Sequence, residues 1–207
     1  MNHSLPALLT GLASVLLSLA QPALAEDGYA LWLRYAPLAA ERRAAVAPHV
    51  RAIVAPASPS AVTRSAVAEL QRGLGSLLGE PVPFTERIEP GSVIVGIPSE
   101  LPDRLDPSIG ELTQELGDEG YALRHTVVDG KPVILLTALS DRGLLYGAFA
   151  LLRHIESGTE LDRLQDSDLP RLRLRLLNHW DNIDRSVERG YAGQSIWDWW
   201  RDRKSVV

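Results

Sequence analysis

Apolar residues recur at steps of three and four along two segments of the chain, and this spacing predicts two amphipathic helices. The first covers residues 61–78, with Ser60 as its N-cap and Gly79 as its C-terminal stop. Its apolar face consists of Val62, Ala66, Leu70, Leu74 and Leu77. A single apolar stripe of this kind must be buried against another element, so a sheet or a second helix is expected beside it.

The second helix is predicted to follow Asp141, which we assign as its N-cap. Its apolar face consists of Leu144, Ala148, Leu151, Leu152 and Ile155. Gly143 and Gly147 lie four residues apart on the same helix. Because glycine has no Cβ, this pair predicts a close approach of the helix to a sheet.

Short apolar runs between the helices predict strands. Residues 51–55 form one short run, and residues 92–97 form a continuous β-branched run typical of a strand buried on both faces. Residues 121–128 and 132–137 flank Asp-Gly at 129–130, which is a strong hairpin signal.

Less regular segments complete the first part of the chain. An alanine-rich helix is predicted within residues 38–50 and ends at Pro48, and the Pro- and acid-rich stretch 98–117 is predicted to be a loop with helical turns near 109–116. The resulting order is β, α, β, hairpin, α. It predicts an α/β fold, a mixed sheet with packed helices, over residues 26–160.

A second unit is predicted after a polar linker at residues 161–170. From residue 171 the chain continues as an alternating Arg/Leu strand, a polar loop and a Trp-rich helix, up to residue 207. One strand and one helix cannot bury their own apolar faces, so this segment is expected to be the first unit of a larger repeat.

The amino-terminal residues resemble an export signal. An apolar stretch at residues 5–19 is followed by Ala23-Leu-Ala25, a small-residue cleavage pattern. We therefore expect residues 1–25 to be a signal peptide and the protein to be exported, to the periplasm or the extracellular medium. An uncleaved anchor helix is the alternative, and its apolar stretch is short for a membrane span.

The composition of the chain argues against several classes of function. The 207 residues contain 21 Lys and Arg against 26 Asp and Glu, a net charge of −5, which argues against a nucleic-acid partner. The chain has no cysteine, and its five histidines are scattered, so neither thiol chemistry nor a metal site is expected. No nucleotide-binding loop or serine nucleophile motif occurs, and no cofactor is predicted.

The strand at 172–177 leads into the most informative segment. Trp180 offers a flat apolar surface to a sugar ring, and the polar side chains around it suit hydroxyl groups: Asn178, His179, Asp181 and Asn182. The alternative is that Trp180 belongs to a core and its neighbours form a turn. Asp181 and Asp184 are more typical of turn residues than of a catalytic pair.

Three segments resemble the xylan α-glucuronidases of glycoside hydrolase family 67. The most specific block is Asn178-His-Trp-Asp-Asn182 with Glu188-Arg-Gly-Tyr-Ala-Gly193 and Ser195-Ile-Trp-Asp-Trp199. The other two are the opening Glu26-Asp-Gly-Tyr-Ala-Leu-Trp-Leu-Arg-Tyr35 and Asp141-Arg-Gly-Leu-Leu-Tyr-Gly-Ala-Phe-Ala-Leu-Leu-Arg153, the latter also shared loosely with β-N-acetylhexosaminidases.

The resemblance implies a hexosaminidase-like N-terminal domain followed by a (β/α)8 TIM barrel, of which residues 171–207 are the first β/α unit. It implies inverting hydrolysis, without a metal, of α-1,2-linked (4-O-methyl)glucuronic acid from xylo-oligosaccharides. By this resemblance, Trp180 stacks on the glucuronic acid of the substrate. The further substrate-binding residues that it implies are Asn178, His179, Asp181 and Asn182. Full-length members are also candidates for homo-oligomers.

Two departures qualify the resemblance. Arg185 stands where the family's loop has a small residue, and the sequence leaves the family pattern near Asp202. The family's acid and base lie later in the barrel, so no catalytic residue is expected in this chain. The chain is interpreted as a truncated or frame-shifted fragment, or as the product of an incomplete gene model. The alternatives are a non-catalytic carbohydrate-binding or interaction module and an accessory domain of a hexosaminidase-type glycosidase.

Overall fold

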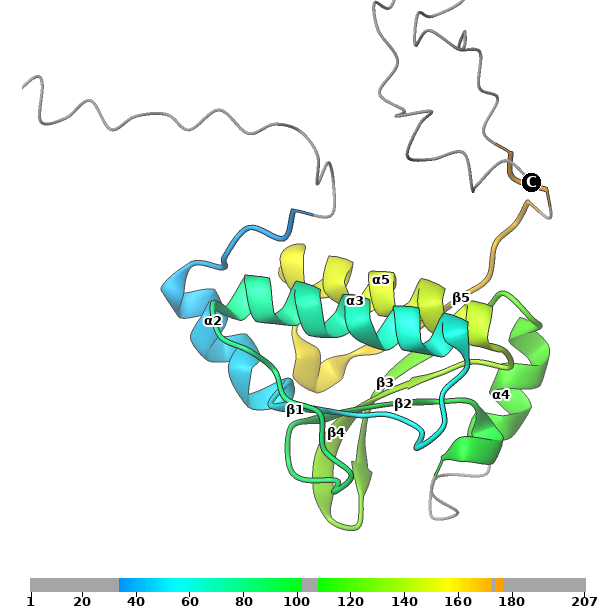
Figure 1. Ribbon diagram of the computed structural model, residues 1–207, viewed down its shortest axis with the longest axis horizontal. Helices are drawn as coiled ribbons and strands as arrows, with labels where there is room; N and C mark the ends of the chain where they lie inside the picture. The colour runs from blue at the N-terminus through cyan, green and yellow to red at the C-terminus, as the bar shows by residue number, and fades with distance from the viewer. Residues whose placement is uncertain (1–33, 102–107, 173, 177–207) are drawn as a thin grey trace, which may run out of the picture. The chain divides into compact units, whose positions relative to one another are not determined.

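Five strands form one mixed sheet in the order β1-β2-β4-β3-β5 (Figure 1). The computed structural model describes residues 34–101, 108–172 and 174–176. The chain divides into two units, Met1–Asp168 and Leu169–Val207, and the sheet belongs to the first. The strands are β1 (Ala52–Val54), β2 (Ser92–Gly96), β3 (Tyr121–Val128), β4 (Lys131–Thr137) and β5 (Gln165–Asp168). β1, β2 and β4 are parallel, whereas β3 is antiparallel to both β4 and β5.

Helices α3 (Ala61–Leu78) and α5 (Asp141–Glu156) lie side by side on one face of the sheet (Figure 1). The remaining helical segments are α2 (Ala40–Val46), α4 (Ser108–Leu116) and the short 3₁₀ helices η2 (Ala47–His49), η3 (Pro98–Glu100) and η4 (Leu161–Arg163). The larger core lies between the sheet and α3 and α5. A smaller apolar cluster on the opposite face contains Ile94 and Leu135, with Ile109 of α4 packed against it.

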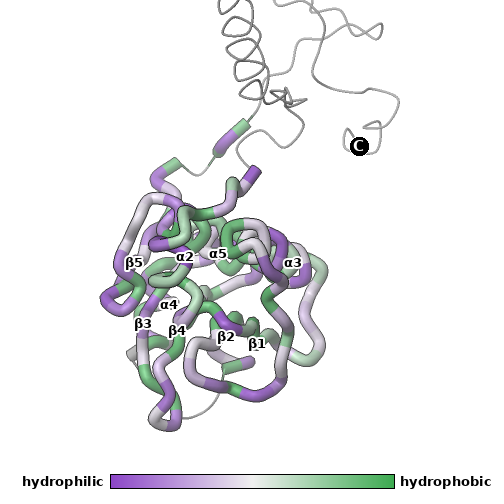
Figure 2. The backbone as a smooth tube through the Cα atoms, turned by 90° about the vertical axis from the view of Figure 1, so that its left-hand side faces the viewer, coloured by the Kyte–Doolittle hydropathy of each residue, from purple (hydrophilic) through white to green (hydrophobic). Residues whose placement is uncertain are grey.

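The predicted first helix is confirmed at both ends. The Ser60 hydroxyl accepts a hydrogen bond from the Thr63 amide at 3.1 Å, and Gly79 takes a left-handed conformation with φ of 75°. The tube of α3 carries both apolar and polar stretches (Figure 2), and Leu70 and Leu74 are completely buried. The helix therefore follows directly from its sequence pattern.

The predicted hairpin is also confirmed. Asp129 and Gly130 have φ values of 50° and 76°, so both central turn residues are left-handed, as a type I′ turn requires. The turn sets a register in which Val128 pairs with Lys131 and Leu123 pairs with Leu136. This register directs Leu123 and Leu136 into the core beneath the helices.

The glycine pair of α5 has the predicted role. A Cβ at Gly143 would lie 2.2 Å from the Gly120 carbonyl oxygen, and a Cβ at Gly147 would lie 2.2 Å from Leu136 Cδ1. Real Cβ atoms do not approach other atoms so closely, so α5 rests against the sheet at a separation that these glycines permit.

Three details differ from the sequence-based expectations. Ser140, not Asp141, is the N-cap of α5, because its hydroxyl accepts from the Arg142 amide at 3.2 Å. Residues 161–170, predicted to be a linker, contain η4 and β5, and β5 is a paired strand of the sheet. The described residues 172 and 174–176 have no regular secondary structure, so the start of a barrel there remains a prediction.

Candidate functional site

The substrate-binding residues predicted from sequence lie outside the described residues. They are Asn178, His179, Trp180, Asp181 and Asn182. Their roles therefore remain predictions. The described structure does show how the chain is held just before this segment, at the edge strand β5.

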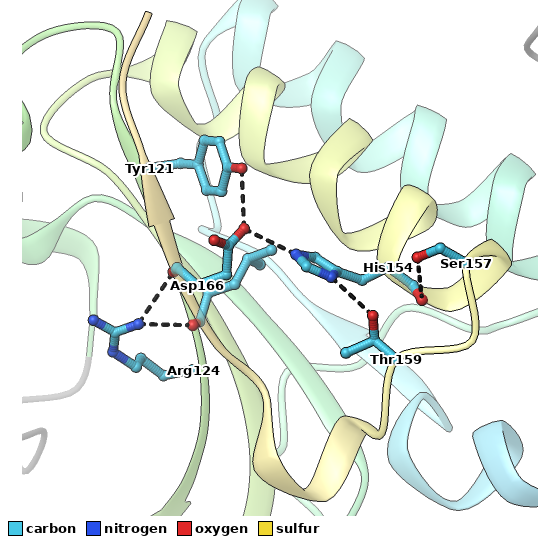
Figure 3. A network of polar contacts seen from close by, with 7 residues as sticks. Tyr121, Arg124, His154, Ser157, Thr159 and Asp166 are labelled. Carbon is cyan, nitrogen blue, oxygen red and sulfur yellow. Dashed lines mark hydrogen bonds and ion pairs between the residues drawn. The ribbon is translucent and has the colours of Figure 1, made fainter.

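A polar network attaches β5 to α5 and β3 (Figure 3). His154 of α5 places its Nε2 atom 2.9 Å from Asp166 Oδ2 and its Nδ1 atom 3.0 Å from Thr159 Oγ1. The Tyr121 hydroxyl of β3 donates to the same Asp166 oxygen at 3.1 Å. One carboxylate on the edge strand is thus held by side chains from a helix and from the neighbouring strand.

Two arginines hold the backbone of the same region. Arg124 Nη1 donates to the Asp166 carbonyl oxygen at 3.1 Å (Figure 3), and Arg42 Nη2 donates to the Thr159 carbonyl oxygen at 2.6 Å. The guanidinium groups therefore satisfy carbonyl groups in and before the edge strand, where the sheet itself supplies fewer partners.

The protonation states of Asp166 and Tyr121 allow this network to stabilise the position of β5. Partial burial by itself would raise the pKa of Asp166, but hydrogen bonds from His154 and Tyr121 outweigh it and hold that pKa below its ordinary value. Burial, together with the Asp166 charge, raises the pKa of Tyr121 to about 12. At neutral pH Asp166 is an acceptor and Tyr121 a donor, so the pair is suited to holding β5 in place.

Sequence reasoning did not identify this network. Asp166 lies 12 residues from His154 and 45 from Tyr121, so no local motif joins them. The missed signal was the strand itself, since a short polar run after a helix is indistinguishable from a linker until it is paired. Pairing of Ala122 with Ser167 and of Leu123 with Asp166 brings the residues together.

A second pair of ionisable side chains joins η2 to β3, where His125 directly follows Arg124. The rings of His49 and His125 meet edge to face with centroids 5.7 Å apart, beside a cavity of about 220 Å³. Burial, and then the proximity of His125, lowers the pKa of His49. Within the described ranges, no group of three or more His, Cys, Asp or Glu side chains is arranged to hold a metal ion.

We expect His49 to make the stability of the protein depend on pH. Because the folded-state pKa of His49 lies below its ordinary value of 6.5, the unfolded chain binds the extra proton first. The free energy of unfolding should therefore fall as the pH drops from 6.5 toward the folded-state pKa. The measurement is the urea midpoint at pH 7.5 and 5.5 for the wild type and His49→Gln, and an equal loss in both proteins would contradict the assignment.

The chain matches two consecutive family models. Residues 31–151 match the glycosyl hydrolase family 67 N-terminus, and residues 154–206 match the middle domain of the same family.

No helix in the described part of the chain combines the length and apolarity needed to cross a membrane.

Curated relatives agree with the family match. The chain is 31 % identical over 188 residues to a probable alpha-glucuronidase A of Aspergillus oryzae, covering 88 % of this chain and 21 % of the relative. It is 31 % identical over 193 residues to alpha-glucuronidase A of Emericella nidulans, covering 86 % and 21 %, respectively. It is 33 % identical over 178 residues to a probable alpha-glucuronidase A of Neosartorya fischeri, covering 84 % and 20 %. The chain thus spans about a fifth of the length of these relatives.

A solved family GH115 4-O-methyl-alpha-glucuronidase, BtGH115A, aligns over 56 % of this chain and 17 % of its own, with 15 % identity and a TM-score of 0.39. That score is too low to support an argument about fold or function. The family models, by contrast, account for nearly the whole chain after residue 30. The chain belongs to glycosyl hydrolase family 67.

Proposed function

We propose that this chain is the N-terminal part of an α-glucuronidase that removes α-1,2-linked (4-O-methyl)glucuronic acid from xylo-oligosaccharides during xylan breakdown. The observation that carries the proposal is the match of two consecutive models of one family, together with relatives named as alpha-glucuronidases. No cofactor is part of the proposal, since hydrolysis of a glycosidic bond requires two carboxylates and water.

The two parts of the chain have different proposed roles. The α/β domain extends through β5, which ends at Asp168, and residues 171–207 begin the proposed (β/α)8 barrel. Within the latter, Trp180 is the stacking platform for the glucuronic acid ring, and Asn178, His179, Asp181 and Asn182 bind its polar groups. The network around Asp166 supports this division, because it holds the last described strand before the proposed barrel segment.

We further propose that residues 1–25 direct export and are removed after Ala25. The apolar stretch followed by Ala23-Leu-Ala25 supports this processing. The intact mass of the exported protein, beginning at Glu26, tests it, and a mass that retains residues 1–25 would contradict it.

The 207-residue chain by itself is expected to be inactive. Inverting hydrolysis needs one carboxylic acid and a separate carboxylate about 6.5–9.5 Å away, and the family resemblance puts both in later barrel segments. The measurement is the release of glucuronic acid from aldouronic acids, which are xylo-oligosaccharides bearing glucuronic acid. Any turnover above the uncatalysed rate would overturn this expectation.

A hybrid enzyme tests the activity itself. Residues 31–206 of this chain would replace the matching part of the Emericella nidulans alpha-glucuronidase A. The hybrid should release glucuronic acid from aldouronic acids, and Trp180→Ala should lower its kcat/KM at least about tenfold, equivalent to about 1.4 kcal/mol. Val127→Ala is the control, because Val127 is 62 % exposed on β3. A folded hybrid without turnover, or with unchanged kcat/KM after Trp180→Ala, would refute the proposal.

A further inference from the structure

An open groove of about 670 Å³ lies beside the edge strand β1, and the proposed catalytic role does not use it. Ile53 of β1 and Val67 of α3 line its apolar part, and Phe84 lies beyond the sheet edge on the other side. Sites for small ligands occupy about 300–1,000 Å³ and are mostly apolar with a few polar groups. The groove has the size and composition of such a site.

The backbone fixes the aromatic side of the groove. The Ile53 amide donates to the Pro83 carbonyl oxygen at 2.9 Å, and the Thr85 amide donates to the Ile53 carbonyl oxygen at 3.0 Å. Phe84 and Ile53 thereby form a parallel bridge, which puts both side chains on the sheet face that α3 covers. Nevertheless, Phe84 remains 49 % exposed. These bonds hold the backbone that carries the ring in place before any ligand arrives.

Polar side chains line the same groove. Arg64 donates from Nη1 to the Pro59 carbonyl oxygen at 2.8 Å, and its guanidinium carries five N–H donors in all. Gln71 donates from Nε2 to the Val82 carbonyl oxygen at 3.3 Å, and its amide oxygen is a further acceptor. Glu86 adds a carboxylate on the side of Phe84. The groove thus combines an apolar surface with both donors and acceptors.

We propose that this groove binds a neutral pyranose chain, whose apolar CH face stacks on Phe84 and whose hydroxyl groups bond to Arg64, Gln71 and Glu86. The identification of the sugar as an unbranched stretch of xylan rests on the proposed function. One cation and one anion cancel, so the groove favours a neutral ligand over a charged one. Hydroxyl groups also satisfy both charged side chains, whereas an apolar protein partner would bury them without hydrogen-bond partners, which is unfavourable.

The site would act as a second sugar-binding position, formed by residues of the α/β domain that do not include Trp180. It would hold the xylan backbone on the α/β domain while the glucuronic acid branch is bound elsewhere. Such a second position raises the effective concentration of a polymeric substrate without taking part in the reaction. The effect is expected for long chains and is absent for short aldouronic acids.

Calorimetric titration of the 207-residue chain with xylohexaose tests the proposal, since this probe lacks glucuronic acid. We expect binding that Phe84→Ala weakens at least tenfold and Arg64→Ala weakens severalfold, whereas Phe84→Tyr retains the ring and the affinity. Val127→Ala should bind as the wild type does, and circular dichroism melting verifies that each variant is folded. Absence of binding, or equal affinity of the wild type, Phe84→Ala and Arg64→Ala, would overturn the proposal.

The outcome separates this inference from the proposed function. Trp180→Ala should leave xylohexaose binding unchanged in the 207-residue chain, while it lowers turnover of aldouronic acids in the hybrid enzyme. Phe84-dependent binding without a functional hybrid would support the groove and refute the proposed activity. A functional hybrid combined with no Phe84-dependent binding would refute sugar binding in the groove and would still support the proposed activity.

Discussion

Replacing Gly143 by alanine is expected to lower the free energy of unfolding by about 2 kcal/mol or more, with a melting temperature about 4–8 °C below that of the wild type. The added Cβ would lie 2.2 Å from the Gly120 carbonyl oxygen and 2.6 Å from Ala138 Cβ. A backbone oxygen cannot rotate away as the end of a side chain can, so α5 would have to move from the sheet. That movement would loosen the packing of Leu144 and Ala148, which are completely buried.

Gly110→Ala is the matched control. Gly110 also lies within a helix, α4, but a Cβ there meets no atom of the described residues within 4 Å outside the adjoining part of its own helix. The substitution should be neutral or stabilise by up to about 1 kcal/mol, because alanine has the higher helix propensity. Thermal and urea unfolding of both variants give the comparison. Equal stability of Gly143→Ala and Gly110→Ala would show that α5 does not depend on the close approach.

Removing the carboxylate of Asp166 is expected to destabilise the protein by about 2 kcal/mol. Asp166→Ala leaves the Tyr121 hydroxyl, on a residue that is 6 % exposed, and His154 Nε2 without their acceptor. The side chains of His154 and Asp166 are 23 % and 29 % exposed, so water replaces part of what is lost and keeps the effect below that of a fully buried group. The bond from Arg124 to the Asp166 carbonyl oxygen survives the substitution.

Asp118→Ala is the control for that experiment. The Asp118 side chain is 70 % exposed, and its ion pair with Arg142 spans 3.9 Å, so its loss should change the unfolding free energy by less than about 0.5 kcal/mol. A double-mutant cycle between His154→Ala and Asp166→Ala should give a coupling of about 1 kcal/mol. Additive effects of the two substitutions would mean that the contact in Figure 3 does not hold β5 to α5.

The stability of β5 has a consequence for the proposed enzyme. An edge strand of four residues presents little apolar surface, and the described side chains of β5 are exposed or half-buried. Such a strand is weakly held by packing, and polar contacts with α5 and β3 compensate for this. If the proposed barrel begins at residue 171, these contacts stabilise the end of the domain that immediately precedes it in the chain.

Much of the α/β domain follows from local sequence. The caps at Ser60 and Gly79, the Asp129-Gly130 turn and the buried run of β2 each depend on neighbouring residues, and each is confirmed by the structure. The glycines of α5 also identified the face that meets the sheet. These features are legible in the sequence because capping, turn conformation and hydrophobic periodicity act over a few residues. The family resemblance was likewise carried by the sequence and is confirmed by the two family models.

Other features were decided by the tertiary structure. The polar run 165–168 is a strand because β3 offers it backbone partners, and Asp166 joins His154 and Tyr121 because the sheet brings distant residues together. The groove at Phe84 exists because Phe84, 31 residues after Ile53, pairs with the edge of β1. Contacts of this kind produce no periodic pattern in the sequence, because their energy depends on which surfaces meet after the chain has folded.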